Sequence, residues 1–81
     1  MTIHVHLFAI LREKAGVGQV ELTLNDGATV KSAVDMLLAR FPALRPYLAT
    51  VRYAVDREYT DAQALLADGS ELALIPPVSG G

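Results

Sequence analysis

The chain has 81 residues and a formal net charge of −2. This length allows one small domain that buries about 60% of its unfolded surface, and no cysteine is present, which excludes disulfides, thiolate metal sites and cysteine nucleophiles. The negative balance argues against nucleic-acid partners. No apolar run has the length of a membrane span, and no signal-peptide pattern precedes the first strand pattern, so we expect a cytoplasmic protein with no membrane partner.

The first half of the sequence predicts two strands, a helical turn and a longer helix. Residues 3–8 alternate between apolar residues and His4, His6 and Phe8, so Phe8 occupies a position where a polar residue would continue the pattern. Residues 20–24 also alternate, and an antiparallel pair of strands is therefore expected. Residues 9–14 between them are typical of a helical turn. Thr29 is expected to cap the N-terminus of the next helix with its hydroxyl group, and Pro42 ends that helix. Its apolar stripe consists of Val30, Ala33, Val34, Leu37, Leu38 and Phe41.

The second half predicts three more strands. Residues 51–56 alternate, residues 58–60 are expected to pair with them, and residues 61–66 are typical of a turn of helix. Residues 71–75 are nearly all apolar, which predicts an interior strand. This order predicts an α+β fold of the β-grasp type, with a mixed sheet of about five strands and one main helix packed across it. The domain would cover residues 1–75, followed by an extended tail over residues 76–81.

The tail combines a stiff segment with a slender tip. Pro76 and Pro77 fix φ and cannot donate to a sheet, so they direct the chain outward. Gly80 and Gly81 carry no side chain, so the terminal carboxylate can enter a narrow channel. A carboxylate can attack the α-phosphate of ATP to form an acyl-adenylate, which then reacts with thiols, persulfides or amines. We therefore expect Gly81 to be a reactant in an ATP-dependent activation.

Four segments resemble the small subunit of molybdopterin synthase, a family of ubiquitin-like sulfur carriers. They are residues 8–13 with Gly16, residues 55–59, residues 68–73 and the tail Ile75-Pro76-Pro77-Val78-Ser79-Gly80-Gly81. The resemblance covers essentially the whole chain, and the tail is its most specific part. Asp56, Ser70 and Ile75 depart from residues that are common in the family, and the last of these lies beside the tail.

The resemblance implies a sulfur-carrier function without catalysis by this chain. An E1-like adenylating enzyme would activate Gly81 with ATP, and a sulfur donor protein would convert it to a thiocarboxylate. The tail would then enter the large subunit, which takes the sulfur to build the dithiolene of molybdopterin on a cyclic pyranopterin phosphate. Two large and two small subunits would assemble, and this chain would bind no cofactor or metal itself. The partner-binding residues would be Phe8, Arg12, Ile75, Pro76, Pro77, Val78, Ser79, Gly80 and Gly81.

Several alternatives remain open at this stage. The chain is also compatible with a sulfur carrier for thiamine or tRNA thiolation, or with a protein modifier joined to lysines through Gly81. Phe8 points opposite to the apolar face of its strand, so it either belongs to a docking patch or is covered by the helical turn at residues 9–14. His4 and His6 share a strand face, but a metal site needs further ligands, and two outward polar residues are the simpler interpretation. Arg40, Arg45, Arg52 and Arg57 form either a basic patch or dispersed charges.

Overall fold

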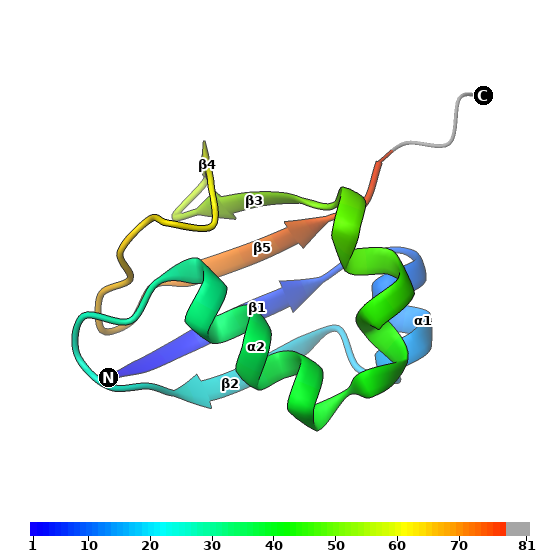
Figure 1. Ribbon diagram of the computed structural model, residues 1–81, viewed down its shortest axis with the longest axis horizontal. Coiled ribbons are helices and arrows are strands. Elements are labelled where there is room, and N and C mark those ends of the chain that lie inside the picture. Colours follow the sequence, from blue (N-terminus) through cyan, green and yellow to red (C-terminus); the bar gives the residue numbers. More distant parts are fainter. Residues whose placement is uncertain (78–81) are drawn as a thin grey trace.

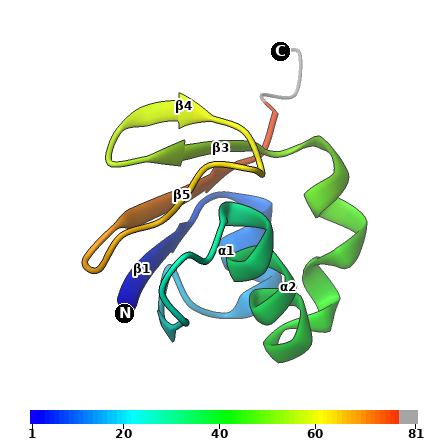
Figure 2. The same ribbon diagram turned by 60° about the vertical axis from the view of Figure 1, so that its left-hand side comes forward.

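The computed structural model describes residues 1–77 as a mixed five-stranded sheet with helices on one face. The strand order is β2-β1-β5-β3-β4, and α2 lies across the sheet (Figures 1 and 2). This confirms the predicted β-grasp architecture. The elements are β1 (Thr2–Leu7), α1 (Ile10–Ala15), β2 (Gln19–Thr23), α2 (Val30–Arg40), the 3-10 helix η1 (Pro42–Thr50), β3 (Arg52–Val55), β4 (Glu58–Thr60) and β5 (Glu71–Ile75). Within residues 1–77, no helix has the length and apolar character needed to cross a membrane.

The central pair of strands determines where the two ends of the sheet lie. β1 runs parallel to β5, with Val5 opposite Leu72 and Leu7 opposite Leu74. β2 is antiparallel to β1, and β3 is antiparallel to both β5 and β4. Because β1 and β5 are parallel, their last residues, Leu7 and Ile75, lie at the same end of the sheet. α1 therefore follows β1 close to the point where the chain leaves β5 (Figure 1). We call this end of the sheet the tail-bearing end.

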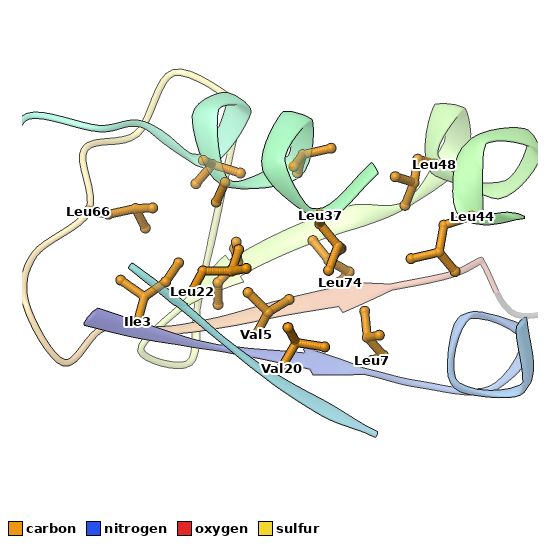
Figure 3. Packing of buried hydrophobic residues seen from close by; sticks show 14 of the residues in the cluster. Ile3, Val5, Leu7, Val20, Leu22, Leu37, Leu44, Leu48, Leu66 and Leu74 are labelled. Carbon is orange, nitrogen blue, oxygen red and sulfur yellow. The ribbon is translucent and has the colours of Figure 1, made fainter. Parts of the chain in front are cut away.

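The hydrophobic core fills the space between the helices and one face of the sheet (Figure 3). Leu37 of α2 is fully buried, as are Ile3, Val5 and Leu74 on the strands beneath it. Val34 and Leu22 are also buried, as the sequence predicts, whereas Leu38 is only half-buried and packs at the margin. Full burial of an aliphatic side chain contributes about 1.5–3 kcal/mol relative to exposure, so this layer dominates the stability of the domain.

The start of α2 is held by side chains and by a distant loop. Thr29 Oγ1 accepts from the Ser32 amide at 3.3 Å and Ser32 Oγ accepts from the Thr29 amide at 3.2 Å, which forms a capping box. The amides of Val30 and Lys31 donate to the carbonyls of Ala64 and Ala62. These bonds satisfy first-turn N–H groups that have no partner within the helix.

The same contacts explain why the helical turn expected at residues 61–66 is wrong. The carbonyls of Ala62 and Ala64 accept from α2, and the Leu66 amide donates to the Ala28 carbonyl at 2.9 Å. The backbone of this segment is therefore bonded to the loop before α2 and to its first turn, and it forms turns and an isolated bridge between Thr29 and Leu65.

The 3-10 helix η1 is an element for which the sequence pattern gave no prediction. Pro42 occupies its first position, where a missing N–H costs nothing. Leu44 and Leu48 lie four residues apart and are both buried in the core. This helix closes the core at the tail-bearing end and leads directly into β3 (Figure 1).

Candidate protein-docking site

The face of the sheet opposite α2 carries an open groove of about 610 Å³. Four strands contribute to it, because alternate residues of each strand point away from the core. Phe8 and Tyr59 stand at its margins and are 48% and 70% exposed. The groove is lined by His6, Phe8, Ala54, Arg57, Tyr59, Glu71, Ala73 and Ile75.

The hollow exists because two alanines form its floor. Ala73 of β5 lies opposite Ala54 of β3, and these two are flanked in register by His6 of β1 and Tyr59 of β4. Because Ala73 and Ala54 carry only a methyl group, β5 and β3 leave room between the larger side chains of His6 and Tyr59 on either side. Such a concave apolar surface on a small domain is typical of a site that accepts side chains of a partner protein.

The groove changes character along β5, from charged to apolar. Glu71, Ala73 and Ile75 follow one another on this face, so the apolar end lies next to Pro76 and the charged end lies at the start of the strand. Ile75 and Pro76 are half-buried and Pro77 is exposed. An apolar partner surface would therefore contact the end of the groove from which the tail departs.

The charged end is fixed by a hydrogen-bonded pair. Nε2 of His6 donates to Oε2 of Glu71 at 2.6 Å. His4 contacts a different residue, with Nδ1 3.4 Å from Nε2 of Gln19. Within residues 1–77, no three histidine or carboxylate side chains come together in a way that could hold a metal ion. Both histidines are half-buried on β1, and each contacts a polar side chain of a neighbouring strand.

Two residues predicted to bind a partner, Phe8 and Ile75, line this groove together. The alternative that the α1 segment covers Phe8 is wrong, since nearly half of the side chain is exposed. Phe8 is followed by Ala9, whose φ of 50° turns the chain sharply from β1 into α1. That turn leaves the aromatic ring at the groove margin.

Arg12 lies outside the groove, on the exposed surface of α1. Its side chain passes close to Gly18: a Cβ placed there would lie 3.4 Å from Nε of Arg12. Val78, Ser79, Gly80 and Gly81, which complete the predicted set, lie outside the residues that the structure describes. The assignment of the whole set to a partner stays a prediction.

Sequence reasoning missed the rest of the groove. His6, Ala54, Tyr59 and Ala73 are brought together by strand register, which joins β1, β5, β3 and β4 in that order. The one available signal was alternation, because each of these residues falls at an outward position of its strand. The small outward residues Ala54 and Ala73 indicate a hollow only once it is known that β3 pairs with β5.

Comparison with known proteins gives a consistent result along the whole chain. The model of the ThiS family matches residues 5–81. The chain is 40% identical over 79 residues to the molybdopterin synthase sulfur carrier subunit of Arabidopsis thaliana, covering 98% of this chain and 82% of that protein. It is 41% identical over 83 residues to the protein of the same name from Chlamydomonas reinhardtii, covering all of both chains.

Two solved structures extend the comparison. The crystal structure of SAMP1 from Haloferax volcanii, a small archaeal modifier protein, superimposes with a TM-score of 0.93 at 34% identity over the full length of both chains. A protein–protein complex of subunits 1 and 2 of the molybdopterin-converting factor from Helicobacter pylori contains a chain with a TM-score of 0.74 at 26% identity, again over all of both chains.

Proposed function

Because the chain belongs to the ThiS family, we propose that it is the sulfur carrier subunit of a molybdopterin synthase. The observation that carries this proposal is the full-length similarity to a sulfur carrier subunit of that enzyme. The β-grasp fold and the groove beside the tail support it, because a carrier must dock on a partner while its terminus reaches the reaction. The cytoplasmic location expected from the sequence is part of the same proposal.

The reactive group in this proposal is the carboxylate of Gly81. An adenylating enzyme joins the carboxylate to the AMP portion of ATP with release of pyrophosphate. The terminal sulfur of a persulfide on a donor protein then displaces AMP to form an acyl disulfide, and a second thiol cleaves this disulfide, leaving the thiocarboxylate and a new disulfide on the donor side. ATP is bound by the adenylating enzyme and not by this chain. The absence of side chains at Gly80 and Gly81 suits entry into an enclosed site.

The partner in sulfur transfer is the large subunit of molybdopterin synthase. The complex of two subunits of a molybdopterin-converting factor supports this assignment. The tail enters the large subunit beside a cyclic pyranopterin phosphate, and two large and two small subunits assemble. The catalytic side chains belong to the large subunit, so this chain alone performs no turnover. Phe8 and Ile75 contact the large subunit through the apolar end of the groove.

A reconstituted reaction tests the proposal. The purified chain is incubated with the adenylating enzyme, ATP and the sulfur donor, and its intact mass is measured to detect the replacement of one oxygen by sulfur. The large subunit and the pyranopterin precursor are then added, and dithiolene formation is followed. We expect both products. Thiocarboxylate without dithiolene would contradict the proposal and favour a carrier for another thiolation pathway.

A second candidate function is protein modification, which the similarity to the archaeal modifier favours. The same adenylate can react with a lysine amine to form an amide in place of a thiocarboxylate. The two functions differ in their products: a modifier appears in its host covalently attached to other proteins. Mass spectrometry of tryptic peptides distinguishes the two functions, because only a modifier produces lysines whose side-chain amine is joined to the carboxyl group of Gly81.

A further inference from the structure

The charged side chains of this protein are separated between the two ends of the sheet. At the tail-bearing end, α1, η1, the first residue of β3 and the residue after β4 carry four cations and two anions, a formal charge of +2. All six side chains are exposed. They are Arg12, Lys14, Arg45, Arg52, Glu13 and Asp61. Arg52 lies directly opposite Ile75 in the β3–β5 register, at the point where the tail begins.

The opposite end of the sheet carries the reverse charge. The loop after β2, the β3–β4 turn, the loop before β5 and the first residues of β4 and β5 hold five anions and one cation, a formal charge of −4. They are Asp26, Asp56, Glu58, Asp68, Glu71 and Arg57. Hydrogen bonds fix their location, since Oδ1 of Asp68 accepts from the Thr2 amide at the start of β1 and Oδ1 of Asp56 accepts from the Glu71 amide.

The two ends are far enough apart to act separately. β1 has six residues and spans about 20 Å at about 3.3 Å per residue. The screening length is about 10 Å at about 0.1 M salt. A partner that approaches the tail-bearing end therefore meets a positive field that the distant carboxylates do not cancel. Within residues 1–77, none of the four cations at this end forms an ion pair with a carboxylate.

We propose that the basic tail-bearing end steers the carrier onto an acidic rim around the opening of the large subunit that receives the tail. This inference rests on the proposed function and adds the chemistry of the partner surface. The separation of charge also orients the carrier, because the acidic end is repelled by the same rim. Exposed charges of this kind act mainly on the rate of association, whereas the apolar groove holds the docked complex.

The test measures the association rate constant with the isolated large subunit by stopped-flow fluorescence. Salt is varied from about 0.01 M to about 1 M, over which the screening length falls from about 30 to about 3 Å. One variant combines Arg45→Glu with Arg52→Glu at the tail-bearing end. A matched control combines Lys31→Glu with Arg40→Glu, which makes the same change in net charge on α2. Circular dichroism confirms that both variants fold.

We expect the wild-type rate constant to fall steeply with salt, and the Arg45/Arg52 variant to associate at least about tenfold more slowly at low salt, because steering accelerates association by about 10–1,000-fold. The α2 control should change less than about threefold, since its charges lie away from the tail. A salt-independent rate, or an equal loss in both variants, would overturn the proposal. The proposal would also be overturned if the wild-type chain bound a short single-stranded RNA and the Arg45/Arg52 variant did not, because this result would assign the basic end to nucleic acid.

These outcomes are separate from those that test the proposed function. If dithiolene forms at the normal yield but association is insensitive to salt, the electrostatic inference alone fails. If association responds to salt and charge as expected but no dithiolene forms, the sulfur-carrier assignment fails while the docking surface stands.

Discussion

Asp56 and Glu71 exchange two hydrogen bonds that join the β3–β4 turn to the first residue of β5. The Asp56 amide donates to the Glu71 carbonyl at 2.9 Å, and the Glu71 amide donates to Oδ1 of Asp56 at 2.9 Å. Asp56 and Arg57 have φ values of 50° and 73°, which is the left-handed geometry of a tight two-residue hairpin turn. Since Glu71 also accepts from His6, this contact connects three strands at the charged end of the groove.

The first prediction concerns this turn. Asp56→Ala removes the acceptor for the Glu71 amide and places a residue without a local hydrogen bond in a left-handed conformation, so we expect a loss of about 1–2 kcal/mol in the free energy of unfolding. Asp56→Asn keeps the carbonyl oxygen and suits the same geometry, so it should be neutral within about 0.5 kcal/mol. Urea unfolding of both variants checks the pair. Equal destabilisation by both substitutions would show that the turn is stabilised by the negative charge of Asp56 and not by its role as a hydrogen-bond acceptor.

The second prediction concerns the helix that covers the sheet. Leu37 is fully buried above Val5 and Leu74 (Figure 3), so Leu37→Ala should cost about 2–5 kcal/mol. This is a large part of the roughly 5–15 kcal/mol available to a small domain. Leu38→Ala serves as the matched control on the next residue, and because Leu38 is only half-buried it should cost less than Leu37→Ala. Thermal or urea unfolding gives both values, and a loss below about 0.5 kcal/mol at Leu37 would contradict the register of α2.

Local patterns predicted most of the fold because the strands and α2 each present one clear apolar face. The period of two in residues 3–8 and 20–24 and the stripe on α2 depend only on neighbouring residues. The segment at residues 61–66 was mispredicted because its carbonyls accept from Val30 and Lys31, more than thirty positions earlier. η1 was missed because Pro42 and Pro46 obscured the spacing of its two buried leucines. The groove depends on register between four strands, which no local pattern contains.

The third prediction concerns docking on the large subunit. Phe8 stands at the apolar end of the groove, and truncation of an aromatic side chain that a partner buries is typically among the most costly changes at an interface. We expect Phe8→Ala to weaken association at least about tenfold, or ~1.4 kcal/mol, without altering the melting temperature by more than a few degrees. Met36→Ala is the matched control, because Met36 is similarly exposed, at 40%, but lies on α2. Isothermal titration calorimetry checks both, and unchanged affinity for Phe8→Ala would remove Phe8 from the interface.

The last prediction concerns the tip of the tail, where the proposed function requires the carboxylate of Gly81 to reach an ATP phosphate and later a pterin. Adding one residue after Gly81 moves the carboxylate by up to about 3.5 Å, and a misplacement of about 1 Å can already cost about a hundredfold in rate. Gly80→Val introduces a branched side chain and excludes backbone angles that only glycine adopts readily. Either change, or deletion of Gly81, should abolish thiocarboxylate formation or sulfur transfer. The melting temperature should stay nearly the same, because the buried cluster consists of residues between Ile3 and Leu74. Dithiolene production with the large subunit and precursor is the measurement, and the intact mass verifies that the added residue is still present. Full turnover by an untrimmed, extended chain would show that Gly81 is not the sulfur-bearing residue.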